Sequence, residues 1–500
     1  MEKRIEIRPG DRATFHNHTR MCVGTGRMDL ALHEEYQLEL RAVQDACHFQ
    51  HIRGHGLFSD QMSIYQERTD PDGSKRVEYC FTYLDRVMDS YLKNGLRPFL
   101  ELGFMPKALA AGEQTLFYWQ AHTTPPKEMA AWTALVQATL RHLKNRYGED
   151  EVSAWPCEIW NEPNLPGFWE NADKEKYLAL YLATARAVKE VLPRMRVGGP
   201  AICGGDGSQQ WIDDFLAFCR DQNAPVDFVT RHAYMGQTPE HRGRYLYHPM
   251  GTVEGLIAEM RASRQIIDSY PTYKGMPMYI TEFNTSYNPF CPIHDTNYNA
   301  AVCAGLLARL GDVAEGYSYW TFGDVFEESG VPPRPFHGGF GLMANGLITK
   351  PTLWAFSFFA GLQGEAVYRD EAAVLVKRKD GGYEGVLWNL CEEDQKTLEI
   401  TLSVPVESDG VALLERVDSE HGNPLRAWHR MGQPYDLTQE QLTFLRQAAQ
   451  PYAQALDAPM RDGRAEIALT LRENDVVRVR ILPAPRQTDA GYDYAYYCKD

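Results

Sequence analysis

The stretch "EIWNEPNL", residues 158–165, gives the first indication of the fold. Its start continues a short apolar run, and Pro163 then disfavours any further regular ladder pairing. Glu162 therefore stands where a strand ends, between the amide of Asn161 and the proline. Charged residues are rarely buried without a partner, so an acid at this place predicts a binding or reactive edge. Glu158, four residues earlier, is expected to lie deeper and to be structural.

The stretch is one of eight short, β-rich segments that alternate with helix-like stretches. The strand segments are 21–26, 49–56, 97–104, 157–163, 196–201, 227–234, 278–284 and 316–322. Apolar residues at helical spacing predict helices at 127–147, 173–192, 209–220, 252–269, 297–310 and 350–362. This alternation favours an α/β fold, a closed (β/α)8 TIM barrel. The alternative is an open doubly wound sheet, which usually has a Gly-rich phosphate loop, and "GTGRMD" (24–29) is only a fragment of one.

The pattern changes after about residue 362. Segments such as 373–390 and 466–482 alternate apolar and polar residues between Gly and Asp turns, which predicts an all-β module. One helix-like insertion interrupts this module at about 437–456, and the strand-like start of the chain is expected to join it. We therefore predict a (β/α)8 barrel at 15–362 and an accessory β-sandwich domain formed by 1–14 with 363–500. The tyrosine-rich end, 489–500, receives no assignment.

Charge and composition limit the classes of partner. The chain has 51 Lys and Arg against 67 Asp and Glu, a net charge of −16, which argues against nucleic acid or an anionic membrane. No run of about 18 apolar residues occurs, so no membrane span is expected. The charged N-terminal stretch lacks a signal-peptide core, and the ten cysteines form no C-x-x-C pair. We expect a cytoplasmic protein with reduced thiols.

Two acids at strand ends carry the chemical hypothesis. Glu162 ends the fourth strand segment and Glu282, in "YITEFN", ends the seventh. Active sites of (β/α)8 barrels lie at the C-terminal strand ends, so the two carboxylates would meet there. A protonated and an ionised carboxyl group are what glycoside hydrolysis requires. Alone, either acid could equally be half of a salt bridge, but the pair favours a glycosidase.

Neither a metal nor a cofactor is expected. His16 with His18, and His51 with His55, have ligand-like spacing. However, they belong to no H-E-x-x-H or similar set, and glycoside hydrolysis needs no metal.

Together, "WNEPN" (160–164) and "YITEFNTSY" (279–287) resemble the two signatures of retaining glycoside hydrolases with a (β/α)8 barrel. The wider set of segments across residues 20–355, including "RPFLELGFMP" (97–106) and "SYWTFGDVFEESG" (318–330), is similar to glycoside hydrolase family 39, especially its β-xylosidases. The resemblance implies an accessory β-sandwich built from both chain ends. It also implies self-association, often as a tetramer.

The resemblance also implies roles for individual residues. Glu162 would be the acid/base and Glu282 the nucleophile of a double displacement, with carboxyl groups about 5–5.5 Å apart. The sugar-binding residues that it implies are His55, Asn161, His232, Tyr234, Tyr287, Trp320 and Glu327 or Glu328. Phe168 is expected to wall the leaving-group side.

The implied substrate is a small carbohydrate, and the preferred reaction is release of terminal β-D-xylose from short xylo-oligosaccharides. Alternatives are a β-glucoside, β-galactoside, arabinoside or uronide, and, from another class, a non-catalytic carbohydrate-binding barrel. A uronide would need a basic residue near the pocket, and the nearest candidate, Arg231, should point away from His232. The chain departs from the family pattern at Gly54, Ser59, Gln61 and Cys157, which leaves the choice of sugar open.

Overall fold

Parallel strands close into the predicted barrel. The computed structural model describes residues 1–391, 396–484, 491, 493 and 496–497. The barrel strands are β2 (Cys22–Arg27), β3 (His51–His55), β6 (Arg97–Pro98), β7 (Leu100–Leu102), β10 (Cys157–Ile159), β11 (Val197–Ile202), β12 (Phe228–Tyr234), β15 (Met278–Asn284) and β16 (Gly316–Tyr319). They pair in parallel in the order β6-β3-β2-β16-β15-β12-β11-β10-β7. Only Phe99 separates β6 from β7, so one chain segment occupies both ends of this order and the sheet closes. The closed sheet confirms the (β/α)8 prediction and excludes an open doubly wound sheet.

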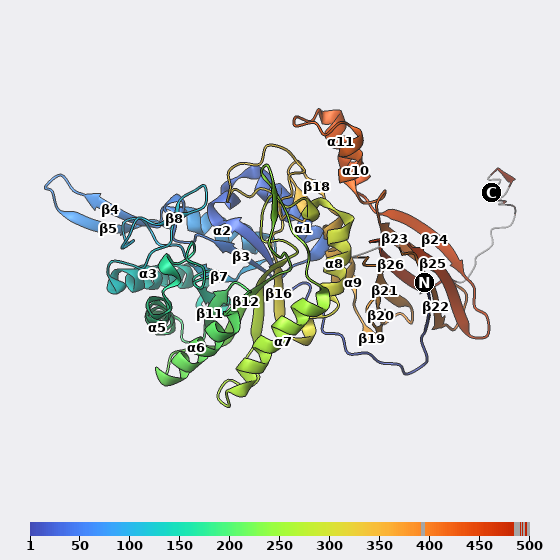
Figure 1. The fold of residues 1–500 in the computed structure, drawn as a ribbon, viewed down its shortest axis with the longest axis horizontal. Helices are drawn as coiled ribbons and strands as arrows, with labels where there is room; N and C mark the ends of the chain where they lie inside the picture. Colours follow the sequence, from blue (N-terminus) through green and yellow to red (C-terminus); the bar gives the residue numbers. More distant parts are fainter. Residues whose placement is uncertain (392–395, 485–490, 492, 494–495, 498–500) are drawn as a thin grey trace.

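A ring of helices covers the outside of the barrel (Figure 1). These helices are α1 (Glu34–Cys47), α2 (Thr82–Lys93), α3 (Met129–Tyr147), α4 (Glu149–Ser153), α5 (Lys174–Val191), α6 (Ser208–Asp221), α7 (Val253–Ser269), α8 (Asn297–Leu307) and α9 (Pro351–Gly361). Helices occur in all six predicted ranges, and α1, α2 and α4 are additional. Gly148 ends α3 at a positive φ of 89°, which glycine adopts without steric cost.

The loops around the barrel contain hairpins and short 3-10 turns. The hairpins are β4 (Tyr65–Thr69) with β5 (Lys75–Tyr79), β8 (Thr115–Leu116) with β9 (Ala121–His122), β13 (Glu240–Arg242) with β14 (Tyr245–Tyr247), and β17 (Met343–Ala344) with β18 (Ile348–Thr349). The 3-10 turns are η1 (Met28–Leu32), η2 (Asp60–Met62), η3 (Glu170–Ala172), η4 (Pro292–Asp295) and η5 (Leu310–Asp312). The β4–β5 hairpin projects farthest from the barrel (Figure 1).

Two further sheets form the accessory β-sandwich. The first has the order β1 (Glu2–Glu6), β22 (Leu398–Pro405), β25 (Arg464–Leu471). The second has the order β19 (Glu365–Arg369), β20 (Ala373–Lys377), β21 (Tyr383–Trp388), β26 (Val476–Pro483), β23 (Gly410–Val417), β24 (Tyr452–Ala458). Their inner faces share one apolar cluster, to which Ile5, Leu402 and Val479 belong. The N-terminal strand β1 runs parallel to β22, with Glu2 opposite Glu399.

The predicted bounds of the helical insertion, about 437–456, are partly wrong. Two helices, α10 (Pro424–Arg430) and α11 (Gln439–Ala448), project from the sandwich, and β24 already begins at Tyr452. Proline suits the first helical position, where its missing N–H needs no partner, so α10 begins at Pro424. Thr438 and Gln441 form a capping box that starts α11.

Barrel and sandwich share apolar contacts. Helix α9 ends at Gly361 and β19 begins at Glu365, so the chain passes directly from one to the other. Trp388 and Val476 of the sandwich belong to the same buried cluster as the barrel core, and Trp388 lies 6.0 Å from the Phe359 ring of α9. The domain boundary at residue 362 stays a prediction.

A buried ion cluster holds the long loop between β16 and α9. Lys350 Nζ lies 2.7 Å from Asp295 Oδ1 and 2.6 Å from Asp324 Oδ2, and it donates to the Gly339 carbonyl at 2.8 Å. All three charged side chains are buried. The cluster thus fixes the middle of a loop that also carries Glu328 and Phe340.

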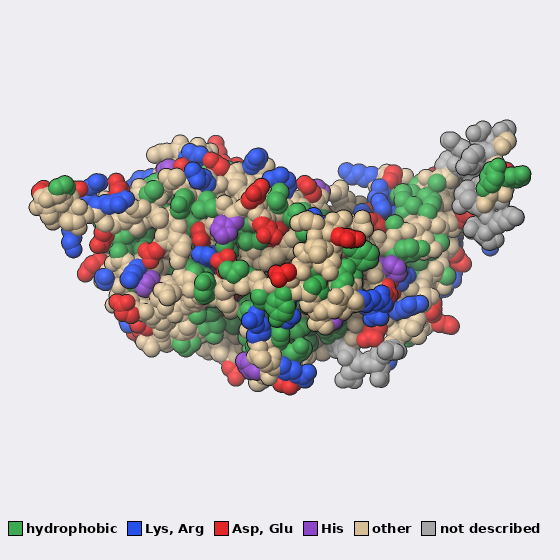
Figure 2. Space-filling model, turned by 90° about the horizontal axis from the view of Figure 1, so that it is seen from above, with side chains coloured by type: hydrophobic (Ala, Val, Ile, Leu, Met, Phe, Trp, Pro, Cys, Tyr) green, Lys and Arg blue, Asp and Glu red, His purple; other side chains and the backbone are tan. Residues whose placement is uncertain are grey.

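On the molecular surface, acidic and basic side chains are interspersed over the face shown in Figure 2. No helix in the described part of the chain is long and apolar enough to cross a membrane. The unassigned tyrosine-rich end lies mostly outside the described residues.

Candidate active site

A cavity of about 260 Å³ opens at the C-terminal ends of the barrel strands. Its lining residues are His55, Asn161, Glu162, Leu165, Phe168, Cys203, Tyr234, Glu282, Tyr287, Trp320, Glu328 and Phe340. They come from the strand ends and following loops of β3, β10, β11, β12, β15 and β16. Most of the predicted site residues therefore meet at the edge where barrel enzymes place their active sites.

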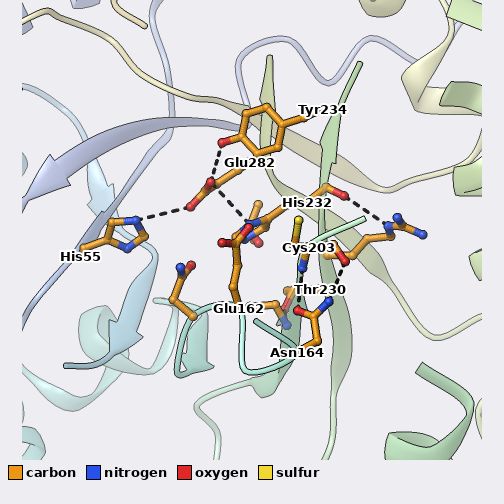
Figure 3. A network of polar contacts seen from close by, with 12 residues as sticks. His55, Glu162, Asn164, Cys203, Thr230, His232, Tyr234 and Glu282 are labelled. Atoms are coloured by element: carbon orange, nitrogen blue, oxygen red, sulfur yellow. Dashed lines mark hydrogen bonds and ion pairs between the residues drawn. The ribbon is translucent and has the colours of Figure 1, made fainter. Parts of the chain in front are cut away.

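The two acids at the strand ends face each other across this cavity (Figure 3). One carboxylate oxygen of Glu162 lies within 4.8 Å of one of Glu282, and a ring nitrogen of His232 lies within the same distance of both. The side chains are 6% and 4% exposed. Two carboxyl groups this close cannot both hold a full charge without a large energetic cost.

Glu282 is held as an ionised carboxylate. Its Oε1 accepts a hydrogen bond from Arg53 Nη1 at 2.7 Å, and its Oε2 accepts one from the Tyr234 hydroxyl at 2.6 Å. His55 Nε2 lies 3.6 Å from Oε1. A charged donor and a hydroxyl thus fix both oxygens, which stabilises the negative form and sets the carboxylate's direction.

Glu162 is held in the opposite protonation state. Burial, and after it the charge of Glu282, raises the pKa of the Glu162 carboxyl well above its usual range. Burial, and after it the positive charge of Arg53, lowers the pKa of His232 well below its usual value, so this ring is neutral. Arg53 can only donate, and its Nη2 lies 3.5 Å from His232 Nε2. We therefore assign the ring proton to Nδ1, which donates to Glu162 Oε1 at 2.7 Å and leaves Oε2 to carry the acid proton.

Arg53 is the main site residue that sequence reasoning missed. It is fully buried inside the barrel, where it bonds Glu158 Oε2 at 2.6 Å, Asn161 Oδ1 at 2.8 Å and Glu282 at 2.7 Å, and pairs with Glu101 Oε2 at 3.0 Å. Burial lowers the Arg53 pKa, but these carboxylates outweigh it and raise the pKa. A signal was present in "HIRGH", because residues two apart on a strand share a face and Arg53 precedes His55 by two.

The two amides of "EIWNEPNL", Asn161 and Asn164, have different roles. Asn161 lines the cavity while its Oδ1 is occupied by Arg53, so its NH2 group remains to donate to a ligand. Asn164 does not line it. Instead, Asn164 Oδ1 accepts from the Cys203 N–H and its Nδ2 donates to the Cys203 carbonyl, both at 3.0 Å (Figure 3). This pair of bonds ties the loop after β10 to the loop after β11, beside Glu162, whose backbone has a left-handed φ of 46°.

Glu158 is structural, as expected. It is fully buried, and its second oxygen accepts from Thr281 Oγ1 at 2.9 Å.

The remaining sugar-binding candidates separate into those inside and outside the cavity. His55 Nδ1 is bonded to Glu101 Oε2 at 2.7 Å, and its ring lies 4.6 Å from that of Trp320. Glu328 lines the cavity, and burial, followed by the charges of Glu282 and Glu162, raises its pKa well above the usual range. Glu327 is not among the lining residues and pairs with Arg27. Of the two alternatives, the structure thus brings Glu328 to the site.

The positions that depart from the family pattern do not line the cavity. A Cβ at Gly54 would meet Thr25 Cγ2 at 2.6 Å, so glycine makes room for a neighbouring strand and does not widen the pocket. Ser59 Oγ donates to the Gly56 carbonyl at 2.6 Å, and Gln61 Nε2 donates to the Trp119 carbonyl at 2.8 Å. Cys157 is buried in β10. Their effect is on loop structure and packing.

Among the described residues, one group of three side chains has the spacing of metal ligands, and it consists of Glu162, His232 and Glu282. Arg53 already compensates Glu282 there, and the proton on Glu162 provides acid chemistry without a metal. His51, which has ligand-like spacing to His55 in the sequence, forms a hydrogen bond with the Met21 carbonyl at 3.0 Å and does not belong to this group.

Comparisons with known proteins agree with this geometry. Residues 4–466 match the model of glycosyl hydrolases family 39. A β-xylosidase of Geobacillus stearothermophilus is 44% identical over 96% of this chain and 95% of its own length, and one of Caldicellulosiruptor saccharolyticus is 34% identical over 86% and 88%. A crystal structure described as a monomeric β-xylosidase from Caulobacter crescentus CB15 superposes with a TM-score of 0.87 at 32% identity, covering 96% of this chain and 99% of that one. The chain belongs to glycosyl hydrolases family 39 and is a glycoside hydrolase.

Proposed function

We propose that the protein is a retaining exo-β-xylosidase that releases terminal β-D-xylose from short xylo-oligosaccharides. The observation that carries the mechanism is the approach of a protonated Glu162 and an ionised Glu282 to within 4.8 Å between oxygens. Retaining glycosidases hold their carboxyl groups about 5–5.5 Å apart, whereas inverting ones leave about 6.5–9.5 Å for a water. The similarity to β-xylosidases at 44% and 34% identity supports the choice of sugar.

In the first step, a Glu282 oxygen attacks the anomeric carbon while the bond from that carbon to the leaving oxygen breaks. The Glu162 proton passes to the leaving oxygen. Glu282 is then an uncharged ester, so the like charge that held the Glu162 pKa up is gone. Glu162 is now a base. It takes a proton from water, the water oxygen bonds to the anomeric carbon, and the ester bond to Glu282 breaks.

The cavity supports a terminal, uncharged sugar. About 260 Å³ is below the roughly 300–1,000 Å³ of drug-sized sites, which suits one sugar better than the middle of a chain. No Lys or Arg occurs among its described lining residues. Arg231, the cation considered for a uronide, is buried and directed toward Ser263 and Glu259. These features favour a neutral glycoside over a uronide.

Hydrolysis of an aryl glycoside panel tests both sugar and mechanism. We expect the xyloside to be cleaved best, with β-xylose as the first product in a proton NMR time course. Glu282→Ala should abolish turnover. Glu162→Ala should still cleave an activated aryl xyloside and, with azide present, should give β-xylosyl azide. Failure of the wild type on every glycoside would contradict the activity, and an α-xylose first product would contradict retention.

Cytoplasmic location and self-association stay predictions. Size-exclusion chromatography with light scattering measures the self-association directly.

A further inference from the structure

Arg334 joins three separate parts of the chain at the C-terminal side of the barrel. It lies on the loop between β16 and α9, and its guanidinium carbon is 5.4 Å from the centre of the Tyr245 ring in β14, 5.6 Å from that of Trp428 in α10 and 4.9 Å from that of Tyr435, which follows α10. It also donates a hydrogen bond to the Tyr245 hydroxyl. We propose that Arg334 is a positioning residue, which ties the accessory domain to two loops of the barrel and thereby sets how tightly the substrate binds.

The contacts of Arg334 depend on its positive charge. Its Nε is buried and has no hydrogen-bond partner in the described structure, so the aromatic faces are its main surroundings. A guanidinium over an aromatic ring is attracted by the negative potential of the ring face, and the attraction is stronger where water is excluded. One cation holds rings from two distant segments, so removing the charge should loosen all these contacts together.

On the barrel side, the contact reaches the wall of the catalytic cavity. Tyr245 belongs to the hairpin β13–β14, and His248, which directly follows this hairpin, packs its ring 4.9 Å from that of Tyr287. Tyr287 lines the cavity, and so does Glu328, which lies on the same loop as Arg334. Arg334 therefore connects the segments that place two lining residues, although it does not line the cavity itself.

On the other side, the contact belongs to the accessory domain. Helix α10 is part of the helical insertion in the β-sandwich, and Trp428 shares a buried apolar cluster with Phe336, Ala344 and Ile348 of the loop between β16 and α9. The Trp428 and Phe336 rings are 5.4 Å apart. The insertion thus packs on this loop, and Arg334 extends the contact to the hairpin.

Loss of the contact should weaken substrate binding without slowing the chemical step. Glu282 lies in β15 and Glu162 follows β10, so both carboxylates keep their places when the two loops loosen. If the loops then hold the binding arrangement for about one tenth of the time, the apparent affinity falls about tenfold, because only that fraction binds substrate. The kinetic part of this inference rests on the proposed function.

Arg334→Met removes the charge and keeps much of the length of the side chain. We expect KM for an aryl β-xyloside to rise about tenfold, with kcat within about twofold of wild type. Arg334→Lys should restore part of the affinity, because it keeps the charge without the planar group. Arg242→Met is the matched control. Arg242 lies on the same hairpin, 4.9 Å from the Tyr247 ring, but this contact stays within the hairpin, so KM should not change.

Tyr435→Ala tests the link to the accessory domain and serves if Arg334→Met does not fold. Tyr435 is 58% exposed, so its removal should leave the fold intact. KM should rise in the wild-type background and should rise no further in Arg334→Met, because both changes break the same contact. Full additivity of the two substitutions, or an unchanged KM in Tyr435→Ala, would overturn the proposed link.

Limited digestion with trypsin tests the same contact without any measurement of activity. Arg244 is exposed in the turn of the hairpin, and cleavage after it requires local opening of the chain. We expect faster cleavage there in Arg334→Met than in wild type or Arg242→Met. Equal digestion rates, or a fall in kcat with KM unchanged, would contradict a positioning role. If wild type cleaves no xyloside, the proposed function fails, while the digestion still decides whether Arg334 holds the hairpin.

Discussion

Arg53 sets the charge balance of the site at the scale of single residues. One buried guanidinium contacts Glu101, Glu158 and Glu282, so a single Arg is shared by three carboxylates in the described structure. Added negative charge nearby is therefore unfavourable, which agrees with the raised pKa values of Glu162 and Glu328. Burial and the charge of Glu282 keep Glu162 protonated, while Arg53 stabilises the negative charge of Glu282.

Replacing Arg53 should destabilise the whole barrel. Arg53→Gln leaves buried carboxylates without a charged partner, a change that typically costs about 3–5 kcal/mol of unfolding free energy. Denaturant unfolding measures the loss. Arg97→Gln is the matched control, because Arg97 pairs with Glu151 at the surface and such pairs contribute about 1 kcal/mol or less. Equal effects of the two substitutions would contradict a buried ionic network at the barrel floor.

The pH dependence of activity should follow the Glu162 carboxyl. The acid acts while protonated, so kcat/KM falls as pH rises through the Glu162 pKa. Glu282→Gln removes the like charge, and the Glu162 pKa should then fall toward its usual value. Carbon-13 NMR titration of the glutamate carboxyl groups in wild type and Glu282→Gln measures the difference. An unchanged Glu162 pKa would show that burial alone determines it.

At the scale of elements, the loop between β16 and α9 brings cavity groups to a site that the strands alone cannot complete. It carries Glu328 and Phe340 into the cavity, while Lys350 holds it through Asp295 and Asp324. The buried lysine thus links the stability of the loop to the shape of the cavity.

Lys350→Met tests this link. Two buried carboxylates lose their cation, so unfolding free energy should fall by about 3–5 kcal/mol, and KM for an aryl xyloside should rise as Glu328 loses its position. Thermal unfolding and steady-state kinetics measure the two effects. Lys144→Met, which removes a surface pair with Glu149, should change neither by much. If Lys350→Met is destabilised but its KM is unchanged, the shape of the cavity does not depend on the ion cluster that holds the loop.

The elements were predictable to different degrees. The eight barrel segments were identifiable because they are short, β-rich and alternate with helical stretches, and two of them, "EIWNEP" and "YITEFN", carry an acid at the end. Arg53 was missed because barrel interiors are usually apolar, and only tertiary structure shows that Glu101 and Glu158 surround it. Trp428 of α10 packs against Phe336, a contact between distant residues that no local pattern reveals. Likewise, only the structure shows that Asn164 binds a neighbouring loop and not the cavity.

At the scale of the whole molecule, barrel and sandwich are expected to unfold together. Trp388 of β21 is buried in the same cluster as the barrel core and contacts α9 and α8. Trp388→Ala should lower unfolding free energy by about 3–5 kcal/mol and should leave one calorimetric transition. Trp428→Ala, in the separate cluster around α10, is the control and should have a smaller effect on that transition. Two transitions, with only one shifted by Trp388→Ala, would show that the domains unfold independently.

The parallel pairing of β1 with β22 has a consequence for synthesis in the cell. Residues 2–6 are synthesised before their partner strand at 398–405, which follows almost 400 residues later. At about 5–20 residues per second, the strand waits roughly 20–80 s with Ile5 exposed. The barrel can form during that interval, whereas the sandwich cannot close until the strands at 398–405, 464–471 and 476–483 have been synthesised. A nascent chain stalled near residue 390 would therefore carry an unpaired strand with an exposed apolar side chain, Ile5, to which a chaperone could bind.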